Sequence, residues 1–159
     1  MVAFTIDAYL PVDRTLPGFL RVTSPVGAQL LYDIPCRGKA DSQNAAAHGN
    51  PDRDPTRPWG DIPSGVYRPT RLMRYDPPQR TFGRFAILLE GQDGDALLAA
   101  QRGRTGLAIH GNRGNERLMA TYGCLRLFDR DMELLAHAIV GTVVVTVHDV
   151  AAWPPREER

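Results

Sequence analysis

Cysteine is scarce in this sequence, and other familiar signals are missing with it. Only Cys36 and Cys124 occur among 159 residues, so at most one disulfide can form, and a disulfide-stapled scaffold is excluded. No apolar run reaches the roughly 18 residues that would indicate a transmembrane helix. The formal net charge is only +1, which indicates neither a nucleic-acid partner nor an anionic membrane surface.

Metal-ligand and export signals are absent as well. The sequence has no CxxC pair. Cys36 and His48 would supply only two ligands, where zinc normally takes three or four, so we expect no metal. Residues 1–17 contain neither a basic segment nor a long apolar stretch. We therefore expect no secretory signal in this sequence, and the export route is left unspecified.

The length and composition of the chain predict one globular domain over residues 1–159. The composition is 43% hydrophobic and 23% charged, which is ordinary for a globular chain. A chain of this length buries roughly 70% of the surface that its unfolded form exposes, so its core needs no covalent or metal support. The tail, residues 151–159, is expected to fray apart from Trp153, which can pack on the domain.

Short runs rich in Val, Ile, Phe, Tyr and Thr, separated by Gly, Pro or Asp, predict strands. This pattern favours a mainly β sandwich or barrel over repeating βαβ units. The predicted strands cover residues 3–7, 19–24, 29–34, 65–73, 82–90, 96–101, 106–110 and 142–150.

Two segments depart from the strand pattern. Residues 129–141 have apolar positions at helical spacing, with Asp129 as the expected N-cap and Gly141 as the stop, so they predict one short helix after Cys124. Residues 37–64 are polar and contain four Pro and three Gly. A connection of this length is uncommon in a compact domain and is usually functional or disordered. We expect a long loop here that serves as a lid over a site.

The stretch from residue 109 to residue 132 combines residues that thiol chemistry requires. His110 ends a predicted strand, and Gly123 permits a sharp turn immediately before Cys124. Such a turn could aim the amides of Gly123 and Cys124 at one oxyanion. The thiol would also need a pKa lowered below its usual value of about 8.5. Arg126 would share a face with Cys124 in an extended segment, where it could hold the thiolate or a substrate carboxylate.

These motifs resemble the active-site pattern of the L,D-transpeptidase catalytic domain, the YkuD-like family. The family pattern is an apolar strand ending in His-Gly, then a loop, then Ser/Thr-His-Gly-Cys, an apolar residue and Arg or Asn. Here "AIHG" (108–111) and "TYGCLR" (121–126) occupy those places. Upstream, "GDIPSGVYRPTRL" (60–72) resembles the family's "TPTGTF" strand entry. The resemblance implies an L,D-transpeptidase-like β-sandwich or barrel with a short helix after the catalytic Cys.

The resemblance also implies a reaction on peptidoglycan stem peptides. Cys124 would attack the carbonyl between the third residue and a fourth, D-residue, and His110 would move the proton. The carbonyl of Gly111 would orient the imidazole. The acyl group would pass to a second stem, a D-amino acid or water, with no cofactor. The site of action would be the periplasm or cell wall. Some relatives without signal peptides resemble toxic effectors, for which an immunity or delivery protein would be a partner.

Two departures from the family pattern affect the expected substrate contacts. Tyr122 replaces the usual His before Gly-Cys, and the loop 112–120 is short, which would reduce the acceptor side and favour water or a small D-amino acid. Thr121, Tyr122, Arg126 and Trp59 are the candidate substrate-binding residues. The alternatives are packing for Tyr122, a surface ion pair for Arg126 and a loop anchor for Trp59.

Two other functions remain open from the sequence. One is a non-catalytic wall-binding module of the same fold, in which Cys124 and His110 are simply buried core residues. The other is a Cys-His peptidase or amidase of another fold. The intact His110/Cys124 pair argues against the first, and the order of the strands argues against the second.

Overall fold

The computed structural model describes residues 3–111 and 117–151, so residues 112–116 of the short loop, and Trp153 in the tail, lie outside the described part. The strands are β1 (Phe4–Pro11), β2 (Gly18–Thr23), β3 (Gln29–Arg37), β4 (Gly65–Gln79), β5 (Gly83–Asp93), β6 (Ala108–His110), β7 (Leu125–Leu127) and β8 (Val143–Val150). The helices are α1 (Ser42–Ala47), α2 (Gly94–Gln101) and α3 (Asp129–Ala138). None of the helices in the described residues has the length and apolar character needed to cross a membrane.

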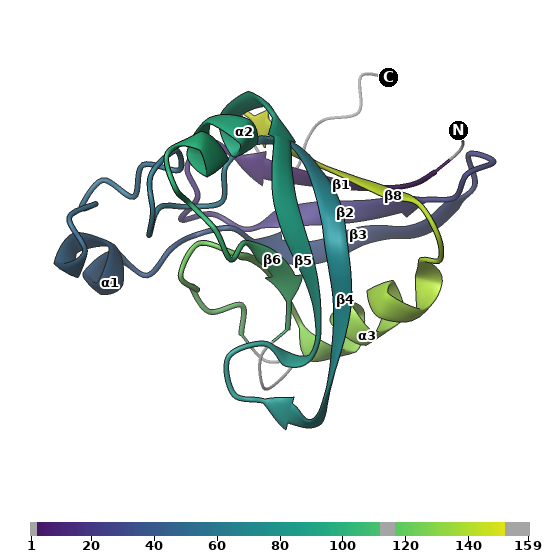
Figure 1. Ribbon diagram of the computed structural model, residues 1–159. Coiled ribbons are helices and arrows are strands. Elements are labelled where there is room, and N and C mark those ends of the chain that lie inside the picture. The colour runs from purple at the N-terminus through teal and green to yellow at the C-terminus, as the bar shows by residue number, and fades with distance from the viewer. Residues whose placement is uncertain (1–2, 112–116, 152–159) are drawn as a thin grey trace.

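The strands close into a barrel in the order β1-β2-β3-β7-β6-β5-β4-β8. Strand β1 pairs parallel with β8, and β6 pairs parallel with β7, whereas the other neighbours are antiparallel. Alternate side chains of β1, namely Ile6, Ala8 and Leu10, are fully buried, as the two-residue period of a strand requires. The mainly β prediction is confirmed, and the architecture is a barrel (Figure 1).

The two shortest strands carry the sequence motifs. In β6 and β7, Ile109 pairs with Leu125 and His110 pairs with Arg126. Ile109 and Leu125 are both fully buried in the core. Both strands are buried along their whole length. A slip of one residue would turn Ile109 or Leu125 to the opposite face of the sheet, where His110 and Arg126 lie, so the apolar core specifies this register. The motif that ends at His110 and the motif that precedes Leu125 are therefore brought side by side.

The strand predicted at residues 96–101 is wrong, because these residues belong to helix α2. The run "ALLAAQ" consists of strong helix formers and lacks β-branched residues. Asp93 caps the helix, since its side chain accepts a hydrogen bond from the amide of Gly94. Ala96 and Ala99, one helical turn apart, are the buried positions. A short apolar run is ambiguous between helix and strand, and here the intrinsic propensity decides.

The helix expected after Cys124 is present as α3, but its ends differ from the prediction. Phe128 is the N-cap residue and makes no side-chain capping bond, while Asp129 is the first helical residue. The helix stops at Ala138, before Gly141. Its buried face includes Met132 and Leu135, at helical spacing. Helices α1 and α2, at other places in the chain, were not predicted.

The segment 37–64 is a folded unit with its own polar interior, and it contains α1. The carboxylate of Asp61 accepts hydrogen bonds from the amide of Ala40 at 2.8 Å and from Nε of Arg53 at 3.1 Å. The side chain of Asn50 bonds to the backbone of Asp54. Its polar composition thus serves internal turns and caps. The expected long loop thus includes one short helix, α1, and these bonds favour a fixed wall over a mobile lid.

Candidate active site

Cys124 and His110 line one cavity of about 820 Å³. Both side chains are largely buried, with exposed fractions of 7% for Cys124 and 2% for His110. The other described walls come from the start of α1, from residues 58–59, from the β4–β5 hairpin tip at residues 80–82, from residues 103–107 and from residues 120–122. The cavity is therefore built by loops on one rigid barrel, which is a common arrangement for binding and catalysis.

The imidazole of His110 has a defined tautomer. Its Nδ1 hydrogen-bonds to the carbonyl oxygen of Gly111. A carbonyl can only accept, so Nδ1 carries the proton and Nε2 is left as the basic nitrogen. Burial lowers the pKa of His110 to about 4, although the Gly111 bond and the charge of Asp129 act in the opposite direction. At neutral pH, His110 is therefore an uncharged base.

The turn before Cys124 depends on Gly123. Its φ is +110°, a conformation that glycine adopts readily and other residues rarely do. A Cβ at this position would also lie 2.2 Å from the carbonyl oxygen of Gly60. In this turn the amides of Gly123 and Cys124 both donate to the hydroxyl of Thr121, at 2.9 and 2.8 Å. The two amides thus converge on one acceptor, which in the resting structure is Thr121 Oγ1.

The thiol of Cys124 is not activated at rest, contrary to the sequence-based expectation. Burial raises its pKa, and this effect outweighs the backbone hydrogen bond from Ala108 and the charge of Arg104. The Sγ atom donates to the carbonyl oxygen of Gly106 at 3.6 Å. At rest the thiol of Cys124 and the imidazole of His110 are therefore both neutral. His110 would have to remove the proton as the thiol attacks, rather than beforehand.

Arg104 is a site residue that the sequence reasoning missed. It is 5% exposed, and burial lowers its pKa. Its guanidinium donates to the carbonyl oxygens of Pro55, Gly60, Asp61 and Gly123, at 2.6, 2.6, 2.7 and 3.2 Å. It therefore ties segment 37–64 to the turn that carries Cys124. These partners are distant in the sequence, so no local signal could have identified it.

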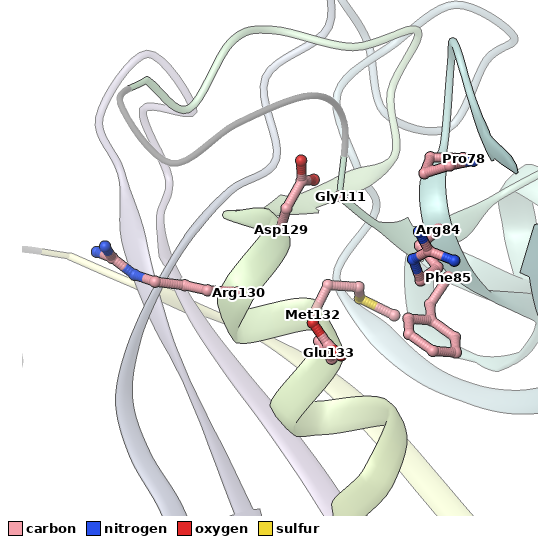
Figure 2. Close-up of a pocket in the computed structure, with 8 residues that line it drawn as sticks. All are labelled: Pro78, Arg84, Phe85, Gly111, Asp129, Arg130, Met132 and Glu133. Carbon is pink, nitrogen blue, oxygen red and sulfur yellow. The ribbon is translucent and has the colours of Figure 1, made fainter. Parts of the chain in front are cut away.

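Asp129 is the second missed residue. The first turn of α3 places its carboxylate against Gly111, where a Cβ would lie 2.3 Å from Oδ1. Gly111 and Asp129 also line a smaller cavity of about 220 Å³ beside α3, with Met132 and Phe85 facing each other across it (Figure 2). The negative charge of Asp129 raises the pKa of His110. Its position in the sequence suggested only a helix cap.

Three of the four candidate substrate-binding residues line the cavity: Thr121, Tyr122 and Trp59. The rings of Trp59 and Tyr122 meet edge to face, with centroids 5.5 Å apart. Trp59 also stacks on His48, with centroids 3.6 Å apart. Tyr122 keeps 56% of its surface exposed. Trp59 and Tyr122 thus form an aromatic wall of the cavity that Cys124 also lines, and His48 packs behind Trp59.

Arg126 does not line this cavity. It is buried in β7 beside His110, and its Nη2 donates to the carbonyl oxygen of Arg117 at 3.4 Å. Its positive charge lowers the pKa of His110. The structure thus places Arg126 next to the candidate base rather than facing the cavity.

Cys36 is separate from the site. It is fully buried in the barrel core, and burial raises the pKa of its thiol. Both Cys36 and Cys124 are free thiols. His48, the other half of the weak zinc pattern, stacks on Trp59. Within residues 3–111 and 117–151, no group of three or more His, Cys, Asp or Glu residues could hold a metal ion.

Comparison with known proteins points to one fold. No model of a protein family matches the sequence, and no curated protein matches it. The structure is similar to that of Bd1075 from Bdellovibrio bacteriovorus, with a TM-score of 0.58 and 14% identity over 91% of this chain and 48% of that one. It is also similar to an L,D-transpeptidase (Yku) from Stackebrandtia nassauensis, with a TM-score of 0.51 and 11% identity over 94% of this chain and 58% of that one. The chain has the L,D-transpeptidase fold.

This finding confirms the YkuD-like fold expected from "AIHG" and "TYGCLR". It also excludes the alternative of a Cys-His peptidase with another fold. The chain spans about half the length of the two solved structures that it matches. At such low identity the likeness concerns the fold alone, and the activity has to be argued from the site.

Proposed function

We propose that the protein is a cysteine-dependent L,D-transpeptidase that acts on the stem peptides of peptidoglycan. The observation that carries the proposal is the placement of Cys124 and His110 on one cavity of an L,D-transpeptidase fold. The basic Nε2 of the imidazole and the convergent amides of the turn at Gly123 support it. A nucleophile, a base and oxyanion donors are the three parts that acyl transfer requires.

The first half of the reaction forms an acyl-enzyme. Sγ of Cys124 attacks the carbonyl carbon between the third and fourth stem residues, while Nε2 of His110 accepts the thiol proton. The carbonyl oxygen becomes an oxyanion that the amides of Gly123 and Cys124 stabilise, in exchange for their bonds to Thr121. The C–N bond then breaks, Nε2 returns the proton to the leaving amine, and the D-residue departs.

The second half transfers the acyl group from the thioester. The incoming nucleophile is an amine of another stem, a D-amino acid or water. It loses a proton to Nε2 of His110 and bonds to the acyl carbon. The C–S bond breaks, and Cys124 regains its proton. The product is a cross-linked dimer, an exchanged tetrapeptide or a tripeptide, respectively. His110 and Cys124 carry the protons in each case.

The proposed place of action follows from the substrate. Peptidoglycan lies outside the cytoplasmic membrane, so the protein would act in the periplasm or cell wall. An effector that attacks the wall of a rival cell is one form of this role, and it would require delivery and immunity partners. Both the location and this role remain proposals.

The test is product analysis on purified tetrapeptide muropeptides. Wild type should give tripeptide, exchanged tetrapeptide when a D-amino acid such as D-Met is added, or 3–3 dimer. Cys124→Ala should fold normally and give none of them, while Cys36→Ala should keep the activity. Binding of muropeptides without any turnover by folded wild type would instead support the wall-binding module.

A further inference from the structure

The cavity carries a feature that the two-step reaction does not use. Asp41 is the one carboxylate among the described lining residues, and the other charged lining residues are Arg80 and Arg104. The half-buried Asp41 precedes α1. Its amide donates to the carbonyl oxygen of Thr121 at 2.7 Å. This bond holds Asp41 close to the catalytic turn.

The carboxylate of Asp41 has room for a further partner. Oδ1 accepts a hydrogen bond from the amide of Asn44 at 2.9 Å, which caps α1. Lys39 directs its ammonium to the carbonyl of Ala40 and the hydroxyl of Ser42, at 3.1 and 3.0 Å. Within the described part of the chain, Asp41 forms no ion pair. The charge of Lys39 acts on Asp41 from a distance, but its ammonium is held by Ala40 and Ser42. A carboxylate that lines a cavity and makes no direct contact with a cation is suited to bind one.

The aromatic wall adds a second, independent attraction for a cation. Trp59 and Tyr122 meet at an interplanar angle of 78°, so their rings form a corner on the same cavity as Asp41. The φ of Trp59 is +70°, an unfavourable conformation for a bulky residue that persists only where its surroundings enforce it. The stack on His48 helps to hold it there. Aromatic faces and a carboxylate together attract ammonium groups.

We propose that Asp41, Trp59 and Tyr122 form the subsite that binds the ammonium group of the acceptor. The acceptor class is a primary amine that is charged at neutral pH, such as the side-chain amine of a stem diamino acid. This inference rests on the proposed function. It places the acceptor on the α1 side of the cavity, away from the β4–β5 hairpin tip that carries Arg80; the two elements lie well apart in Figure 1.

With the acceptor amine bound at this subsite, the bonds and protons of the transfer step can be followed. The bound ammonium loses one proton to solvent and becomes a nucleophilic amine. Its nitrogen bonds to the acyl carbon on Cys124 and loses a second proton to Nε2 of His110. The C–S bond breaks, and the thiolate takes that proton back. One amide is formed, one thioester is cleaved and one proton is released.

The experiment measures how the acyl-enzyme partitions between transfer and hydrolysis. Wild type and Asp41→Asn are incubated with a tetrapeptide donor and either an amine-bearing stem or hydroxylamine, which is uncharged at neutral pH. Asparagine preserves the cap of α1 and removes only the charge. We expect the ratio of transfer to hydrolysis to fall roughly tenfold for the charged amine, as for the loss of one charged hydrogen bond. The ratio for hydroxylamine should stay constant.

Two further variants complete the test. Tyr122→Leu should also lower transfer to the charged amine, and it keeps the proposal testable if Asp41→Asn fails to fold. Asp52→Asn, an exposed change in the same segment, should leave both ratios unchanged. The same ratio of transfer to hydrolysis in wild type, Asp41→Asn and Tyr122→Leu would overturn the subsite. Variants that are acylated more slowly by the donor but keep the wild-type ratio would overturn it as well. If wild type forms no acyl-enzyme at all, the proposed function itself fails.

Discussion

At the scale of single residues, burial controls the chemistry of the site. It lowers the pKa of His110 and raises that of Cys124. Both groups are therefore neutral near pH 7, and a preformed thiolate–imidazolium pair is disfavoured. In the proposed reaction, proton transfer would therefore accompany attack on the substrate, and the rate would depend on Nε2 of His110 being unprotonated.

The pH dependence of kcat/KM tests this view of His110. Because burial lowers the pKa of the imidazole to about 4, we expect the acid limb of the profile near that pH rather than near the ordinary value of 6.5. Asp129→Asn removes a negative charge that raises this pKa, so the limb should move to still lower pH. An acid limb near 6.5 in wild type, or an upward shift in Asp129→Asn, would contradict the account.

The same shift affects stability. The folded state holds His110 less basic than the unfolded chain does, so the unfolded state binds more protons between the two pKa values. His110 therefore contributes a loss of stability as the pH falls from about 6.5 towards 4. Urea unfolding across this range should show a smaller loss in His110→Gln than in wild type. An equal loss in both proteins would show that other groups cause it.

Arg104 has the largest expected effect on stability among the site residues. Arg104→Met leaves the four carbonyl oxygens that it binds without their donor, at a cost of about 3 kcal/mol. Urea unfolding gives the free energy. Arg102→Ala is the control, since within the described residues the side chain of Arg102 makes one hydrogen bond, to Thr56, at 2.7 Å. The control should lose at most about 1 kcal/mol. Similar losses in the two variants would refute the role assigned to Arg104.

At the scale of elements, the segment 37–64 is the point where sequence and structure differ most. Its amides are bonded within the segment and to its surroundings: Ile62 to the carbonyl of Gly38, Asp61 to that of Arg53, and Asp41 to that of Thr121. We expect these amides to exchange slowly with deuterium, with or without a stem peptide. If the amides of this segment exchange rapidly without ligand and more slowly with a stem peptide, the segment is a mobile lid, as the sequence suggested.

The strands could be predicted from sequence where their residues alternate. Ile6, Ala8 and Leu10 face the core because a strand places every second side chain on one face. The run 96–101 has no such period, and its helix is decided by propensity and by the cap at Asp93. The folded state of 37–64 depends on partners such as Arg104, which lies more than forty positions away from Pro55, Gly60 and Asp61. Local patterns contain no information about such contacts.

The candidate site was predictable to a similar extent. A His and a Cys alone at this spacing are a weak signal. The site was recognisable because "AIHG" and "TYGCLR" together resemble the L,D-transpeptidase pattern. The direction of the pKa shift at Cys124 was not predictable, because it depends on how deeply the fold buries the thiol. The position of Asp129 against Gly111 likewise depends on where α3 begins.

At the scale of the whole molecule, a closed barrel holds two short strands in register and lets loops supply the rest of the site. The parallel pairing of β6 with β7 sets the relative positions of His110 and the turn at Cys124. Segment 37–64 and the β4–β5 hairpin tip then supply walls around them. The fold fixes the candidate catalytic pair, and in the proposed function the walls would determine which acceptor is used.

In the proposed function, Cys124 is the nucleophile and His110 is its general base. The most direct measurement is intact-protein and peptide mass spectrometry of the acyl-enzyme, trapped by acid quench during turnover of a tetrapeptide stem. We expect an adduct of tripeptide mass on Cys124 in wild type, less adduct in His110→Gln, and none on Cys36. An adduct on Cys36, or continued cleavage of the stem by a folded Cys124→Ala protein, would contradict the account.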